Sequence, residues 1–269
     1  MRYDLAQLAR RGKKVRRESV TLKPITAPGT LATDLYAAAY APVVKAWDKA
    51  LPDLMAVYSR ALATMTQDSP EEVGGTLNGI EAELTRLLFS IRLRIEQWAL
   101  KVEKWQRTKW VANVKAATGV ELGTLVGAGD MRAPVSTAIE RNVSLVKSVS
   151  EQSRARIGDA VFRGLQQNRA ADEVAKEIRE AVDMSRRRAR NVASDQLVKL
   201  SSQMNAERRR EAGIDTWEWV SSHKVHFRPE HAARDGKRYA DGDAPGDLPG
   251  ELPFCGCTER AVLSLDGEF

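Results

Sequence analysis

The sequence predicts a mainly α-helical protein, in which long helices fill the N-terminal half and a small α+β domain follows at the C-terminal end. Two observations predict this architecture. Apolar residues recur at helical spacing through most of the chain before Gly213, and the apolar–polar alternation typical of strands occurs only after it. With 269 residues, 43% of them hydrophobic, the chain can bury a substantial core.

The net charge is concentrated at the N-terminus. Residues 1–17 hold seven Lys or Arg residues and one acid, and the rest of the chain holds 35 basic and 35 acidic residues, so the formal charge of +6 belongs to this segment. The pattern predicts either a solvated tail or a basic arm that contacts phosphate or an acidic protein surface. With a Pro- and Gly-rich linker at 23–29, the arm forms a first region, 1–30. The candidate contact residues are Arg10, Arg11, Lys13, Lys14, Arg16 and Arg17.

We expect a helical region over residues 31–130. Its first helices should restart at Pro42 and Pro52, because proline fits the first turn of a helix, and Ser69-Pro70-Glu71-Glu72 has the composition of a further helix start. Glycines soon after this start should delay its regular part. Further glycines between residues 119 and 129 should end the helix and mark a boundary.

One long helix in this region has an apolar face. From Leu84 to Trp105, apolar residues alternate at spacings of four and three, which predicts a helix with one partner-facing side. Tryptophans alternate here with basic residues, a pattern that also occurs where proteins bind nucleic acid by stacking and phosphate contact. We expect instead that Trp98, Trp105 and Trp110 fill the apolar face.

The third predicted region, 131–269, begins with helices and ends with strands. Four helices are expected, over residues 134–150, 151–167, 170–182 and 185–212. Ser185 should cap the last of them and Gly213 should end it. Residues 216–221 and 258–265 have the pattern of strands, which makes this part of the chain α+β.

The C-terminal region also holds the residues best suited to chemistry. Cys255 and Cys257 are separated by one residue and cannot easily form a disulfide with each other. Together with His231 and either His226 or His223, they would supply a tetrahedral sulfur and nitrogen set suited to a structural Zn²⁺ ion. The sequence therefore predicts a candidate zinc site in this tail.

An alternative interpretation closes the tail without a metal. His231 would be hydrogen-bonded to a backbone carbonyl or to Asp235, Arg228 would pair with a carboxylate, and the two cysteines would be small buried hydrophobic residues. Gly236 would supply a positive φ after Asp235, in a turn that continues into Lys237. The acidic segment 241–251 lacks the ligand spacing of a calcium-binding loop, so we expect a solvated loop there.

Several blocks of this region resemble one family, in the same order. Asp195-Gln196-x-x-Lys199-Leu200 is similar to an Asp-Gln-x-x-Lys-Leu signature. The blocks Arg228-Pro229-x-His231-x-x-x-Asp235-Gly236-Lys237 and Cys255-Gly256-Cys257 follow at matching spacing. Over residues 142–263 the chain thus resembles the phage head morphogenesis family typified by the Mu F minor head protein, or MuF domain.

The chain departs from the pattern of that family in three places. Lys224 stands where family members usually have an acidic residue, and many members have Cys-x-x-Cys where this chain has Arg228-x-x-His231. Glycine replaces the arginine that is usual in the middle of the closing Cys-x-Cys motif.

The resemblance implies a non-enzymatic minor capsid protein that assembles with the prohead in the host cytoplasm and belongs to the virion, at the portal vertex or the capsid interior. Its implied partners are the phage portal protein, capsid or scaffold proteins and packaged double-stranded DNA, with the arginine-rich stretches 186–190 and 208–210 as further candidate DNA contacts. The alternative is a metal-dependent, nuclease-like enzyme centred on His231 and the Cys-x-Cys tail. The sequence has no recognisable signal peptide or membrane span, so no membrane partner is expected.

Overall fold

The computed structural model describes residues 2–12, 18–64, 69–225, 227–244 and 246–265. The chain forms two compact units, each assembled from segments that are distant in sequence. Unit 1 consists of Met1–Leu31, Ala99–Ala138 and Ser194–Phe269, and unit 2 consists of Ala32–Trp98 and Ile139–Ala193. All three regions predicted from the sequence contribute residues to unit 1, and their boundaries stay predictions.

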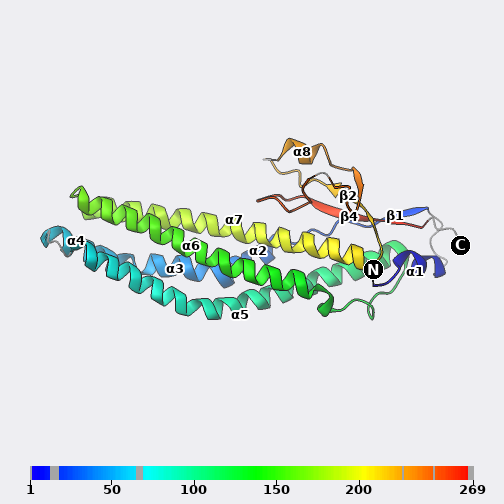
Figure 1. Cartoon of the computed structure of the whole chain (residues 1–269), viewed down its shortest axis with the longest axis horizontal. Helices are drawn as coiled ribbons and strands as arrows, with labels where there is room; N and C mark the ends of the chain where they lie inside the picture. Colours follow the sequence, from blue (N-terminus) through cyan, green and yellow to red (C-terminus); the bar gives the residue numbers. More distant parts are fainter. Residues whose placement is uncertain (1, 13–17, 65–68, 226, 245, 266–269) are drawn as a thin grey trace. The chain divides into compact units, whose positions relative to one another are not determined.

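Unit 2 is built of helices alone among its described residues (Figure 1). It begins within α2 (Gly29–Leu35), continues through a π-helical turn η1 (Tyr36–Tyr40), α3 (Ala41–Lys49) and α4 (Leu51–Thr64), and includes the first part of α5 (Ser69–Thr118). The expected helix starts at Pro42, Pro52 and Ser69 are confirmed to within one residue. The fold class, mainly helical with a small C-terminal sheet, is confirmed as well.

The remaining helices are longer than the sequence suggested. α6 (Arg132–Gln166) and α7 (Ala171–Glu211) are each continuous, so the predicted breaks at 150 and 182 were wrong. Ser185, expected to cap a helix, lies inside α7, where its hydroxyl donates a 3.0 Å hydrogen bond to the Ala181 carbonyl and also contacts the Ser153 hydroxyl. Likewise, α5 runs without interruption through the glycines at 74, 75 and 79.

The apolar face of α5 is confirmed as a buried face. Ile91, Ile95 and Val102 are at most 1% exposed, and Trp98 is 3% exposed. Trp110 is equally buried and donates a 3.1 Å hydrogen bond from its indole to the Tyr3 hydroxyl. Stacking of nucleic acid bases on these two tryptophans is therefore contradicted.

Unit 1 contains a four-stranded antiparallel sheet with the strand order β1-β4-β2-β3. The strands are β1 (Ser19–Thr21), β2 (Thr216–Val220), β3 (Arg238–Ala240) and β4 (Thr258–Ser264). Strands β2 and β4 confirm the two predicted strands. β1 and β3 were missed, because three residues are too few to establish an alternating pattern.

The described part of the N-terminal segment, residues 2–12, packs into unit 1. α1 (Leu5–Arg11) buries Leu5 and Ala9 in a core that includes Trp110 and the sheet residue Leu263. The backbone N–H groups of Arg2 and Tyr3 donate hydrogen bonds to the carbonyl of Glu211, which is an unpaired acceptor at the end of α7. The basic composition of this segment gave no indication that Leu5 and Ala9 form a buried apolar face.

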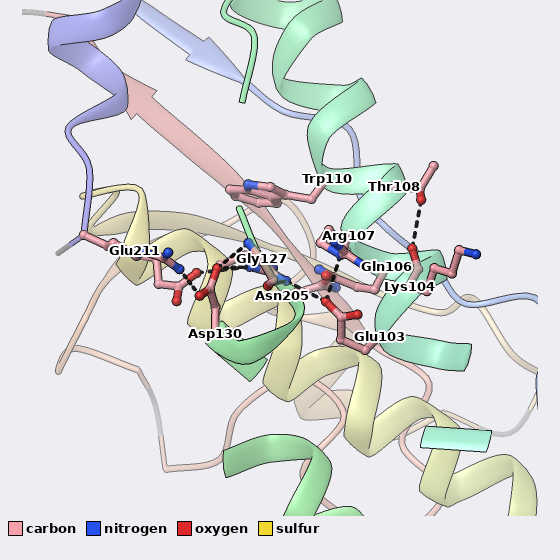
Figure 2. A network of polar contacts seen from close by, with 12 residues as sticks. Glu103, Lys104, Gln106, Arg107, Thr108, Trp110, Gly127, Asp130, Asn205 and Glu211 are labelled. Atoms are coloured by element: carbon pink, nitrogen blue, oxygen red, sulfur yellow. Dashed lines mark hydrogen bonds and ion pairs between the residues drawn. The ribbon is translucent and has the colours of Figure 1, made fainter. Parts of the chain in front are cut away.

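Two neighbouring arginines at the end of α7 are buried together with their charges. The Arg208 side chain is fully buried and contacts Glu103 on α5 (2.9 Å), Asp130 in the short helix η2 (Ala128–Met131; 3.2 Å) and Glu211 (3.3 Å). It also donates a hydrogen bond to the Gly127 carbonyl. Figure 2 shows these acidic partners converging from different elements on one point. Burial lowers the pKa of Arg208, and the neighbouring carboxylates oppose that shift.

Arg209 ties the same helix end to the sheet. Its guanidinium donates to Glu259 on β4 (3.0 Å), to Asp241 just after β3 (2.5 Å) and to the carbonyls of Ile214 and Asp215 just before β2. Burial raises the pKa of Glu259 and the arginine opposes that shift. Each arginine thus satisfies buried acceptors that would otherwise be unpaired.

We predict that Arg208→Met destabilises the protein by about 3–5 kcal/mol, because it leaves buried carboxylates without their counter-charge. Arg210→Met is the matched control: this arginine lies two residues further along the same helix, its side chain is 49% exposed, and its replacement should change stability by less than about 0.5 kcal/mol. Urea denaturation followed by tryptophan fluorescence measures both. Equal losses in the two variants would contradict the assigned role of the buried pair.

Candidate metal centre

Three side chains that are distant in sequence meet in the C-terminal tail. His231 lies in α8 (Pro229–Ala232), a single turn whose first position suits Pro229. Cys255 and Cys257 lie just before β4 and belong to an apolar cluster with Trp219 of β2. All three side chains are buried.

Their ligand atoms are close enough to share one ion. Sγ of Cys255 lies 3.4 Å from Nδ1 of His231, and Sγ of Cys257 lies 3.7 Å from the same nitrogen. The three potential ligand atoms lie within 4.8 Å of one another, and both cysteines are free thiols. Within the described residues, no other group of three or more His, Cys, Asp or Glu side chains meets this criterion.

A polar and aromatic layer fixes the orientation of His231. Its Nε2 lies 2.9 Å from Oδ2 of Asp247, whose Oδ1 accepts a 2.8 Å hydrogen bond from Arg234. Arg234 lies over the ring of Trp219, which makes an edge contact with the imidazole at a centroid separation of 5.1 Å. Because a carboxylate only accepts hydrogen bonds, this contact favours a proton on Nε2 and leaves the Nδ1 lone pair to the sulfurs.

The two cysteines perturb each other's pKa. Their mutual hydrogen bond lowers the pKa of Cys255, against the opposing effect of burial, and together with burial raises the pKa of Cys257. Backbone hydrogen bonds with Cys257 and Gly250 also lower the pKa of Cys255.

α7 positions the segment that carries the cysteines. Oδ1 of Asp195 accepts a 2.6 Å hydrogen bond from the backbone N–H of Phe254, and its Oδ2 accepts hydrogen bonds from Lys199 (2.6 Å) and Gln196 (3.1 Å). The Asp-Gln-x-x-Lys-Leu signature thus has a physical role. Asp195, Gln196 and Lys199 form one hydrogen-bonded group on α7. Asp195 of this group holds the backbone next to Cys255.

Two glycines allow the turns around the centre. Gly250 has a φ of +77°, and a Cβ atom there would lie 2.4 Å from Oγ of Ser202 on α7, so a larger residue would clash as well as strain the backbone. Gly236 has a φ of +74°, as predicted, and donates a 2.9 Å hydrogen bond to the Trp219 carbonyl. The Lys237 carbonyl in turn accepts from the Trp219 N–H, which extends the pairing of β2 and β3.

Two departures from the resembled family meet in space. A Cβ atom on Gly256 would lie 2.7 Å from Cε and 2.8 Å from Nζ of Lys224, and 2.9 Å from Cβ of Ser222. The lysine therefore fills the space in which a side chain at position 256 would begin.

The other predicted ligands do not join the centre. His223 is 77% exposed and lies 3.5 Å from Asp235, and it is outside the three-residue group. His226 lies outside the residues that the structure describes. Asp235 does not hold His231, as one interpretation predicted, but accepts a 2.7 Å hydrogen bond from the Ser221 N–H.

The acidic segment and Arg228 also differ from expectation. Asp247 and Asp241 were expected to be solvated, yet the first is paired with His231 and Arg234 and the second with Arg209. Arg228 donates a 3.0 Å hydrogen bond to the Pro253 carbonyl, not to a carboxylate. Nothing in the spacing of the acids singled out Asp247, because it comes within range of His231 only after the loop has folded.

The predicted basic contact residues are only partly placed. Arg10 lies in α1 and donates a 3.2 Å hydrogen bond to the Leu265 carbonyl, and Arg11 is the last residue of that helix. Lys13, Lys14, Arg16 and Arg17 lie outside the described residues. In the stretch 208–210, Arg208 and Arg209 are buried and paired, which contradicts their proposed contact with DNA.

Comparison with known proteins finds one matching family for the segment that holds this centre. Residues 155–260, which include the signature on α7, α8 and both cysteines, match the family model described as Phage Mu protein F like protein. This segment is a Mu F-like domain. The predicted resemblance is confirmed, and it supports a phage head morphogenesis protein.

One curated relative of the chain is an uncharacterized protein from Haemophilus influenzae, 29% identical over 154 residues. The match covers 56% of this chain and 34% of the relative, so it spans about a third of that protein's length. No solved structure gives a significant match.

Proposed function

We propose that this protein is a non-enzymatic minor head protein of a phage, which docks on the portal vertex or the inner capsid surface during prohead assembly. The match of residues 155–260 to the Mu F-like family is the observation that carries this proposal. Portal, capsid or scaffold proteins would then be its partners, and the virion its location. In the described part of the chain, no helix combines the length and the apolar character needed to cross a membrane.

The structure of the tail supports a structural role over the enzymatic alternative. A metal-dependent nuclease centred on His231 would need its metal open to a phosphodiester. His231 is only 3% exposed and Cys255 and Cys257 are each 4% exposed. Their contacts with Asp247 and the backbone are those of a domain closure, so we assign no catalytic residue.

The surface that we infer for docking is an apolar stripe on the part of α5 that belongs to unit 2. The buried face of this helix, including Ile91 and Ile95, is unavailable to a partner. Phe89 and Leu93 are 74% and 47% exposed, and at about 100° per residue their spacing places them together on the opposite face. Exposed aromatic and aliphatic side chains in a row are typical of protein interaction sites.

We predict that the double variant Phe89→Ser/Leu93→Ser folds normally but is reduced about tenfold in purified proheads, because it loses apolar contact area at the docking surface. Arg94→Ser is the control, since this exposed residue lies on a different face of the same helix. Quantitative mass spectrometry of proheads measures incorporation, and circular dichroism checks the fold. Absence of the wild-type protein from proheads would refute the proposed function, whereas wild-type incorporation of the double variant would refute only this surface.

Contact with packaged DNA would fall to the basic arm. Deleting residues 1–17 is a poor test, because Leu5 and Ala9 belong to the core of unit 1. We therefore predict that replacing Lys13, Lys14, Arg16 and Arg17 together by Gln lowers the slope of log affinity against log salt for duplex DNA by about 3 to 4. Replacing the exposed Lys45 and Lys49 of α3 by Gln should leave the slope unchanged. An unchanged slope in the arm variant would show that these four residues do not contact DNA.

A further inference from the structure

We propose that His231, Cys255 and Cys257 bind one Zn²⁺ ion, which acts as a structural clamp between α8 and the segment that leads into β4. This inference goes beyond the proposed function in the phage head and does not depend on it. It rests on the separation of three ligand atoms, on the kind of donors they are and on the residues that hold them.

The separations match those of a tetrahedral site. With Zn–S and Zn–N bonds of about 2.3 Å and 2.0 Å, a sulfur and a nitrogen ligand lie about 3.5 Å apart, and two sulfurs about 3.8 Å apart. The observed Sγ–Nδ1 distances are 3.4 Å for Cys255 and 3.7 Å for Cys257. An ion can therefore occupy the space between the three atoms with only small adjustments of the side chains.

The donor set selects the metal. Thiolate sulfur and imidazole nitrogen favour zinc over magnesium or calcium, which prefer oxygen ligands. Sulfur ligates the metal as thiolate, so binding would release any thiol protons on the two cysteines.

The surroundings of His231 are those of a metal ligand. A ligating histidine commonly presents its second ring nitrogen to a carboxylate, which fixes the tautomer and makes the first nitrogen a better donor. Oδ2 of Asp247 is buried and lies 2.9 Å from Nε2. Arg234 holds the other oxygen of the same carboxylate. Asp247 is thus a positioning residue for the proposed site.

Arg228 links the same two segments without a metal. It donates a 3.0 Å hydrogen bond to the Pro253 carbonyl, two residues before Cys255. Three side chains would thus ligate the ion, and water would complete the coordination.

The clamp joins segments that have little structure of their own. α8 has four residues and β3 has three, too few for either to be stable without tertiary contacts. The apolar cluster beneath them consists of Trp217, Trp219 and the two cysteines, with three partly buried neighbours. Metal binding would therefore contribute directly to the stability of the tail.

The test is the metal content of the full-length protein after dialysis against equimolar ZnSO₄ and then metal-free buffer. Elemental analysis should find about one zinc per chain, and stripping it with a chelator should lower the melting temperature. Cys255→Ser, Cys257→Ser and His231→Ala should each lose most of the metal, while the exposed His223→Ala should keep it. Retention by His226→Ala would agree with three side-chain ligands, and its loss would replace the proposed water with that histidine.

Two further measurements keep the test decisive if the ligand variants fold poorly. Wild-type protein loaded with Co²⁺ should show a near-ultraviolet thiolate-to-metal band, and Asp247→Asn should weaken zinc binding by about 10- to 100-fold while the protein stays folded. The proposal is overturned if the folded wild-type protein retains no zinc and shows no such band. It is also overturned if mass spectrometry finds Cys255 and Cys257 joined as a disulfide in the native protein.

Discussion

The architecture of unit 1 depends on the burial of two guanidinium groups at one helix end. Arg208 and Arg209 are stable in the interior only because acceptors from α5, η2, β4 and the segment after β3 surround them. A buried charge costs several kcal/mol if its partners are missing, so these elements must come together as a set or not at all. The backbone of Arg2 and Tyr3 completes the arrangement by capping the same helix end.

The helix that ends with Arg208 and Arg209, α7, also positions the C-terminal tail. Asp195 lies 13 residues before Arg208, which is about 20 Å along α7, and binds the backbone beside Cys255. A rigid helix therefore fixes both the sheet and the loop with the two cysteines. Since the tail has a small apolar cluster, its shape relies on specific polar contacts such as those of Asp195, Asp247 and Arg228.

The sequence predicted the features that depend on local pattern. The apolar face of α5, the helix starts at Pro42 and Pro52, the turn at Gly236 and strands β2 and β4 all follow from spacing or from single residue types. The sequence also predicted that His231 and the two cysteines lie in one site. Features that depend on tertiary contact were missed. No local signal distinguishes a buried Arg208 from an exposed Arg210, or Asp247 from the other acids of its loop, and Ser185 has the composition of a cap although α7 continues through it.

The proposed function rests on the match of residues 155–260 to the Mu F-like family, a segment that ends in a closed tail. We propose that this protein has a structural role in the phage head. An asymmetric cryo-electron microscopy reconstruction of proheads that contain and lack this protein tests the claim directly. The account predicts difference density of helical bundles against the portal vertex or the inner shell. Proheads without such density, together with absence of the protein from their composition, would contradict it.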